Sequence, residues 1–306
     1  MSKKQFQLFP NVSEIKPEEV TLKSILLPLT SQTADQHVMR IAGQFAFQFR
    51  ATLKALFVRA DPRSAVPFMG EGLTADMIKD LSDATEREGL AQANVAFKNY
   101  SAIMEDLGVH LTETAQKTET ATARWQVAAG QISDYIGRRA RTADLAICAQ
   151  PNSDVPDSQD IFHDLIFRSG RPVMIVPEKC SEAPGRHIII AWNGRAEGAR
   201  AIGAALPLLW SAEKVTLLQI GDPDPDRPTL EDAADYLKDH GVSPLLEARK
   251  KGSKGTGEEI HAAAKDLQAD MIVIGAYSHS RWREMILGGV TRHLIGKSEL
   301  PVFMSH

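Results

Sequence analysis

The sequence has little cysteine, no excess of positive charge and no long apolar run. Only two cysteines, Cys148 and Cys180, occur among 306 residues. That is too few for a disulfide framework, so we expect free thiols in a reducing compartment. The net charge is −4, and such a chain has no overall positive field to attract it to nucleic acid or to an anionic membrane. We therefore expect neither nucleic acid nor membrane among its partners.

No segment is apolar for long enough to cross a bilayer. The longest candidate, residues 201–210, has about half of the length that a crossing helix needs. The basic start of the chain is not followed by the apolar stretch of a secretory signal. These observations predict a cytoplasmic protein.

The composition and length are those of a globular protein with two domains. Hydrophobic residues make up 43% and charged residues 24% of the chain, which argues against a disordered protein. A chain of 306 residues is long enough to bury two cores. We expect an N-terminal arm at residues 1–22, a first domain at 23–180 and a second domain at 186–306, with a Pro- and Gly-containing linker between the domains.

Four strand-like segments of the first half recur in the same order in the second half. The pairs are residues 24–29 and 187–192, 51–57 and 214–220, 143–148 and 269–274, and 171–176 and 300–305. The offset falls from 163 residues in the first two pairs to 126 in the third, so the first half carries 37 more residues, which we assign to a longer helix within residues 70–107. Segments with helical apolar spacing alternate with the strands. Each half is therefore predicted to be an α/β domain with a doubly wound parallel sheet.

The most informative stretch lies near the end of the chain. Residues 271–274 are an apolar run that ends at Gly275, as in a buried strand, and a helical segment begins near Gly288 and Gly289. Glycines at a helix start let the backbone approach a ligand, and the unpaired N–H groups and the helix dipole there favour an anion such as phosphate.

Gly275, Ser278, Gly288 and Gly289 stand at a spacing that resembles the Gly-x2-Gly-x9-Gly-Ser/Thr nucleotide loop of the universal stress protein family. Ser278 replaces the second glycine of that loop, and Gly289 replaces its hydroxyl residue. The resemblance covers nearly the whole chain after about residue 22. It implies two tandem Rossmann-like domains, an adenine nucleotide ligand (ATP, ADP or AMP), a role in stress tolerance or signalling with little or no turnover, and a homodimer.

In a doubly wound sheet, ligands bind at the carboxyl ends of the strands where the strand order reverses. The resemblance therefore implies one nucleotide site in the second half, in the loops after its first and fourth strands. Its residues are Ala191, Asn193, Gly275, Ser278, His279, Arg281, Gly288, Gly289, Val290 and Thr291.

Neither a catalytic residue nor a metal site is expected. The family commonly has an aspartate where this sequence has Asn193, and an amide brings no charge for magnesium. His279, His293 and His306 lack the i, i+4 spacing of helical zinc ligands. In the first half Ala149 stands for Gly275, and Asp154 and its acidic neighbours would repel phosphate, so we expect no phosphate cradle there.

Two other functions remain open on the sequence. The chain could be a nucleotide-free interaction protein in which the glycine loop is kept for packing, or a weak ATP hydrolase, which Asn193 disfavours. Trp192 could stack on a base, although burial against a helix is the more frequent fate of a tryptophan beside a strand.

Overall fold

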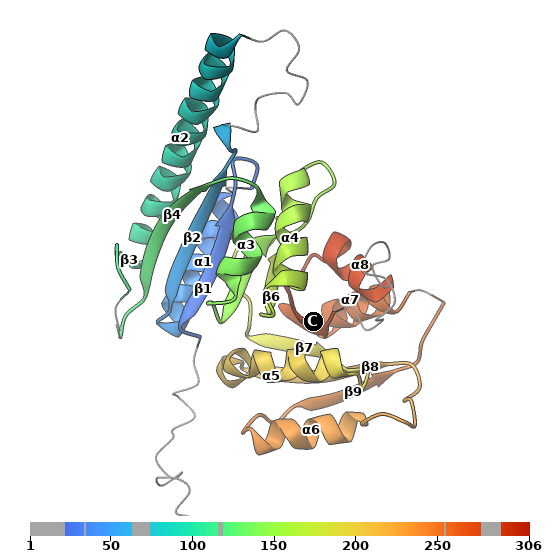
Figure 1. The fold of residues 1–306 in the computed structure, drawn as a ribbon. Helices are drawn as coiled ribbons and strands as arrows, with labels where there is room; N and C mark the ends of the chain where they lie inside the picture. The colour runs from blue at the N-terminus through green and yellow to red at the C-terminus, as the bar shows by residue number, and fades with distance from the viewer. Residues whose placement is uncertain (1–21, 34, 63–73, 116–118, 254, 277–288) are drawn as a thin grey trace, which may run out of the picture.

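The computed structural model describes residues 22–33, 35–62, 74–115, 119–253, 255–276 and 289–306, in which strands and helices alternate (Figure 1). The elements of the first half are β1 (Ser24–Leu29), α1 (Gln36–Phe49), β2 (Thr52–Arg59), α2 (Ala75–Asp106), β3 (His110–Leu111), β4 (Thr122–Ala129), α3 (Ile132–Ala140), β5 (Leu145–Ala149), α4 (Pro156–Arg168) and β6 (Val173–Val176). Those of the second half are β7 (His187–Ala191), α5 (Ala196–Ser211), β8 (Lys214–Ile220), α6 (Leu230–Asp239), β9 (Leu245–Arg249), α7 (Thr256–Asp266), β10 (Met271–Gly275), α8 (Gly289–Lys297) and β11 (Val302–Ser305). Every strand expected from the repeat is present, and the α/β fold class is confirmed.

The described strands form a single 11-stranded sheet in the order β3-β4-β2-β1-β5-β6-β11-β10-β7-β8-β9. Within each half the strands are parallel, and the crossovers place strand order reversals between β1 and β5 and between β7 and β10. The halves join through an antiparallel pair of β6 and β11, in which Met174 lies opposite Phe303. Because β6 and β10 cover both sides of β11, that strand offers no free edge for a homodimer.

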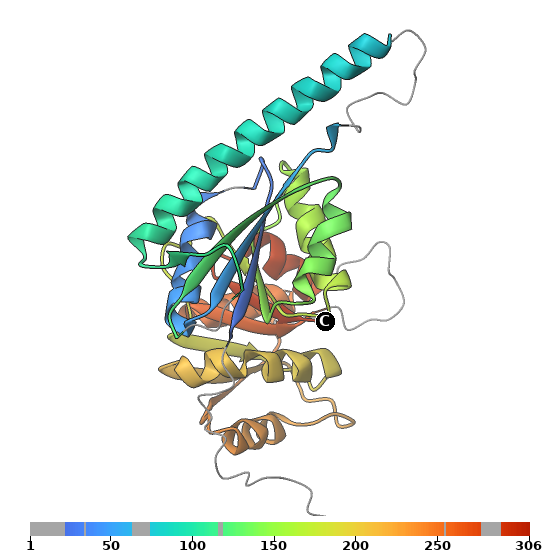
Figure 2. The ribbon, with the colours of Figure 1, turned by 60° about the vertical axis from the view of Figure 1, so that its left-hand side comes forward.

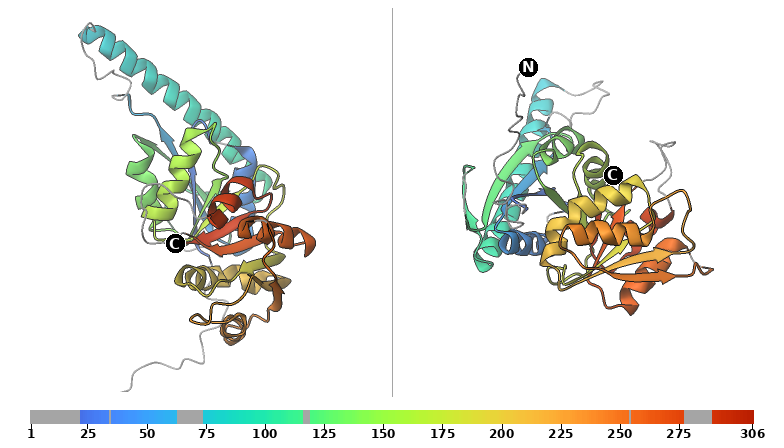
Figure 3. Two further views of the ribbon diagram at one scale, coloured as in Figure 1. Left: turned by 90° about the vertical axis from the view of Figure 1, so that its right-hand side faces the viewer. Right: turned by 90° about the horizontal axis from the view of Figure 1, so that it is seen from below.

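The helices cover both faces of the sheet, as Figure 3 shows from two further directions. Helices α1, α2, α5 and α6 contribute to one buried apolar cluster, and α3, α4, α7 and α8 contribute to another. Each cluster contains residues from both halves of the chain, for example Phe45 and Phe303 in the first and Leu165 and Leu294 in the second. The two repeats therefore share their cores across the β6–β11 pair.

The longer helix predicted for the first half is α2, with 32 residues. Thr74 caps its start by accepting a hydrogen bond from the backbone N–H of Met77. Its buried residues begin only at Gly89, and its first turns extend past the body of the molecule (Figure 2). None of the helices in the described ranges has the length and apolarity that a membrane span requires.

Candidate functional site

The residues predicted to bind a nucleotide lie at the edge of the sheet where the second half reverses its strand order. Ala191 ends β7 and Gly275 ends β10, and these neighbouring parallel strands are in register, with Ile274 beside Ala191. The chain leaves β7 towards β8 and β9 and returns to the opposite side of β7 as β10. The carboxyl ends of β7 and β10 therefore flank the position at which doubly wound sheets bind ligands.

Gly275 is a close-packing position. A Cβ atom added to it would overlap the backbone nitrogen of Gly198 and the carbonyl carbon of Glu197, and would lie 2.8 Å from the Cβ of Glu197. These atoms belong to the first turn of α5, which rests directly on the end of β10. The glycine is therefore required for helix–strand packing, whatever else it does. Sequence reasoning missed Glu197 and Gly198 because it searched for ligand contacts, although Gly198 is itself a small residue in the first turn of a helix.

Asn193 is exposed, and its side chain holds its own loop. The backbone N–H of Arg195 donates to Asn193 Oδ1 over 3.1 Å, an Asx turn that sets the entry to α5. Gly194 follows with φ +66, a conformation that favours glycine, and packs against Arg227 and the Pro228 carbonyl. The amide oxygen is thus already engaged in shaping the β7–α5 loop.

Trp192 is only 7% exposed. Its indole N–H donates to the carbonyl oxygens of Thr229 at 2.9 Å and Pro228 at 3.2 Å. The ring therefore ties the β7–α5 loop to the start of α6 and is not presented for stacking on a base. Of the two possibilities weighed from the sequence, burial of Trp192 is therefore confirmed.

Helix α8 carries the remaining described residues of the predicted site. Gly289 is exposed and a Cβ there would meet no atom of the described part of the chain within 4 Å, whereas Thr291 is buried. Gly257, in the first turn of α7, packs against α8, since an added Cβ would lie 2.9 Å from the Val290 carbonyl oxygen. Because α7 follows the carboxyl end of β9, this contact places the start of α8 on the ligand-binding edge of the sheet.

Four predicted residues, Ser278, His279, Arg281 and Gly288, lie outside the described residues. Among those that the structure describes, no group of three or more His, Cys, Asp or Glu side chains could hold a metal ion.

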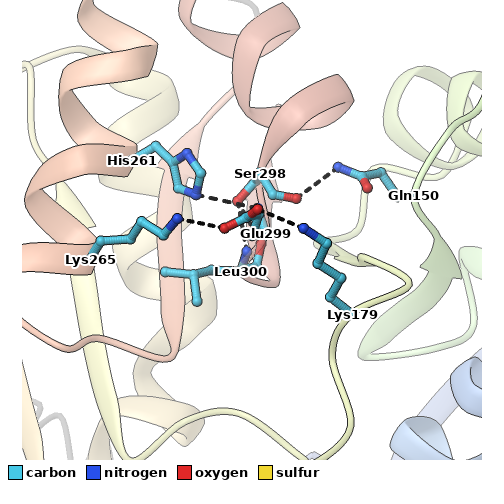
Figure 4. A network of polar contacts seen from close by, with 7 residues as sticks. All are labelled: Gln150, Lys179, His261, Lys265, Ser298, Glu299 and Leu300. Carbon is cyan, nitrogen blue, oxygen red and sulfur yellow. Dashed lines mark hydrogen bonds and ion pairs between the residues drawn. The ribbon is translucent and has the colours of Figure 1, made fainter.

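A polar network fixes the far end of α8 at the joint between the halves (Figure 4). Glu299 lies between two lysines, with Oε1 at 2.8 Å from Lys179 Nζ and Oε2 at 2.6 Å from Lys265 Nζ. Hydrogen bonds from both lysines and their charges lower the pKa of Glu299 to about 2. Gln150 adds a bond across the joint, donating to the Ser298 carbonyl over 3.0 Å.

His261 belongs to the same network and accepts a hydrogen bond from the Glu299 backbone N–H over 3.3 Å. Burial, with the charge of Lys265 in second place, lowers the pKa of His261 below the usual histidine value. The neutral imidazole that this favours is the form able to accept that bond.

The geometry agrees with a comparison of the sequence with known families. Residues 185–306 match the family described as the universal stress protein family. The second half of this chain is a universal stress protein domain. No curated protein matches the chain.

Solved structures extend the likeness in fold to both halves. A universal stress protein from Archaeoglobus fulgidus DSM 4304 has a TM-score of 0.64 at 16% identity, over 92% of this chain and 97% of its own. A protein assigned to the same family from Pseudomonas aeruginosa UCBPP-PA14 has a TM-score of 0.53 at 14% identity, over 95% of each chain. A universal stress protein in complex with cAMP matches 51% of this chain and 98% of its own, with 14% identity and a TM-score of 0.31. The first two matches show a shared fold that spans the tandem arrangement.

Proposed function

We propose that this chain binds an adenine nucleotide (ATP, ADP or AMP) at one site in its universal stress protein domain. It would act as a regulatory or stress-tolerance module with little or no turnover. The observation that carries the proposal is the convergence of β7, β10 and the start of α8 on one edge of the sheet, where a Cβ at Gly289 would meet no atom of the described residues within 4 Å. A helix start of this kind offers unpaired N–H groups and a favourable dipole to a phosphate.

In this proposal the backbone of Gly289, Val290 and Thr291 meets the phosphates, together with Gly288 from the preceding segment. Ala191 and Asn193 border the site from the β7 side. Asn193 supplies no carboxylate, so the proposed binding does not depend on magnesium.

A second candidate, a nucleotide-free interaction protein, is favoured by the packing of Gly275. A glycine that α5 requires would be kept even if no ligand bound. Acid release of nucleotide from purified protein, followed by chromatography, separates the two functions. Nucleotide recovered at a substantial fraction of the protein concentration supports binding.

Thermal melts with millimolar ATP, ADP and AMP provide the quantitative test. A ligand at 100 times its dissociation constant stabilises the folded protein by roughly 2.7 kcal/mol. Gly289→Val should abolish this shift while leaving the melt without ligand almost unchanged, because a side chain there has room.

Gly296→Val is the matched control. Gly296 lies in the same helix and also has nothing within 4 Å of an added Cβ, so this variant should keep the full nucleotide shift. If none of the three nucleotides raises the melting temperature of the wild-type protein, nucleotide binding is refuted. The second candidate, a nucleotide-free interaction protein, is then the better explanation.

A further inference from the structure

The sheet has an open strand edge at each of its two ends. In the second half the outermost strand is β9, which pairs with β8 alone among the described strands. In the first half β3 pairs only with Thr122 and Ala123 of β4. The rest of β4, residues 124–129, pairs with β2 on one side and with no described strand on the other (Figure 1). Such an edge presents N–H and C=O groups that can bind another strand.

The backbone groups of Trp125 and Val127 point outward from the open edge of β4. Gly130, directly after the strand, donates its backbone N–H to the Arg59 carbonyl oxygen over 3.0 Å, on the β2 side. Successive residues of a strand direct these groups to opposite sides, so the even-numbered residues of β4 face β2 and the odd-numbered residues face away from it. The N–H and C=O groups of Trp125 and Val127 are therefore oriented to bond a further strand.

The two open edges differ in their charge. Native sheets commonly protect an open edge with charged side chains. Strand β9 carries two in five residues, Glu247 and Arg249, which pair at 2.9 Å. Beyond β3, strand β4 carries only Arg124, followed by Trp-Gln-Val-Ala-Ala, and the side chain of Val127 is 43% exposed. The edge of β4 is therefore the less protected of the two.

Helix α2 adds apolar surface beside the edge of β4. The ring of Phe97 contacts that of Trp125 at a centroid distance of 5.6 Å, yet Phe97 remains 37% exposed. Leu90 lies two turns earlier on the same side of α2 and is 44% exposed. Together with Val127, these side chains form an apolar strip along an open strand. Exposed apolar surface of this kind marks a site of interaction with another protein.

We propose that β4 pairs with the β4 strand of a second copy of this chain, antiparallel and centred on Val127. A twofold axis through this position places Val127 opposite its own copy and Trp125 opposite Ala129 of the second copy. The outward N–H and C=O groups of both strands then exchange hydrogen bonds. Arg124 would lie opposite Gly130 of the second copy, so the pairing brings no like charges together.

The position of α2 favours a second copy over a partner that supplies only a strand. Helix α2 packs on both β2 and β4. Because neighbouring strands lie about 4.8 Å apart, the two α2 helices of the pair would lie antiparallel and about 10 Å apart. Packed helices have a spacing of about 8–10 Å. Leu90 and Phe97 would then be covered by the other α2, whereas a single added strand would leave them exposed.

Sedimentation velocity of the full chain, from low micromolar to hundreds of micromolar, should show a reversible dimer. Val127→Lys should weaken dimerisation by at least about tenfold, because two lysines would then oppose each other across the axis. Leu246→Lys is the matched control in β9, since Leu246 is 44% exposed, and it should leave the dimer unchanged. Thermal melts of both variants report whether the monomer remains folded.

Val127→Cys in a Cys180→Ser background tests the register of the pair. The Cα atoms of two residues that oppose each other in a hydrogen-bonded antiparallel pair lie about 5.5 Å apart, within the range of a disulfide, about 4.4–6.8 Å. The remaining native cysteine, Cys148, is buried and so is shielded from oxidation. Mild oxidation should therefore give a covalent dimer, whereas Leu246→Cys in the same background should give none.

Three results would overturn the proposal. They are a wild-type chain that stays monomeric at hundreds of micromolar, a dimer that Leu246→Lys weakens as much as Val127→Lys, and a dimer that Val127→Cys does not cross-link. The ATP melt shift reports on β7, β10 and α8 of the second half, so the outcome for nucleotide binding is measured separately.

Discussion

Gly275→Ala should destabilise the protein strongly, although it adds a single methyl group. The new Cβ would overlap backbone atoms of Glu197 and Gly198 in the first turn of α5. A clash with the tip of a flexible side chain can be relieved by rotation, but here α5 or β10 must shift as a whole. Overpacking of this kind costs about 1–3 kcal/mol, and we expect a loss near the upper end, about 3 kcal/mol. That is a large part of a typical total stability of about 5–15 kcal/mol.

Thermal and urea unfolding followed by circular dichroism measure this loss, and for a chain of 306 residues a change of about 3 kcal/mol corresponds to a fall in Tm of roughly 5 °C. Gly289→Ala is the matched control, because its Cβ would contact none of the residues that the structure describes and should cause no loss. The packing explanation of Gly275 is refuted if the two variants melt together at the wild-type temperature. If Gly275 served the ligand alone, its substitution would reduce nucleotide binding and leave the unfolding curve in place.

Two further predictions concern the joint between the halves. Glu299→Gln should destabilise the protein at neutral pH but not in strong acid. The pKa of Glu299 in the folded state, about 2, lies below its unfolded value. The stabilisation by the carboxylate is therefore complete above about pH 4.3 and is lost as the pH falls towards 2. Melts of both proteins between pH 7 and pH 2.5 check this, and a difference that does not shrink in acid contradicts it. The isolated segment 186–306 should self-associate, because removal of β6 uncovers the apolar edge of β11. A monomer mass in light scattering at tens of micromolar protein would contradict this self-association.

Much of the fold could be predicted because the same order of strand-like segments occurs twice in the sequence. The apolar runs at residues 24–29 and 187–191 coincide with β1 and β7, and the surplus in the first half is α2. The pairing of β6 with β11 could not be predicted in the same way. A strand buried on both faces looks the same in sequence whether its neighbour belongs to the same chain or to a second copy. The apolar run at residues 300–305 therefore predicts a strand but not which strand pairs with it.

The candidate site was less predictable than the fold for a similar reason. A glycine that admits a phosphate and a glycine that admits a helix both lack a Cβ, so spacing alone could not show that Gly275 supports α5.

The antiparallel pair of β6 and β11 has an evolutionary consequence. When two identical chains meet through such a pair, every substitution occurs twice and must suit both positions at once. A covalent duplication that keeps the same pairing removes this constraint, because each copy can then drift alone while the shared sheet holds the assembly together. Among the described residues, the long helix α2 and the glycine start of α8 each occur in one half only. The tandem chain thus combines a sheet that runs through both halves with two halves that differ from each other.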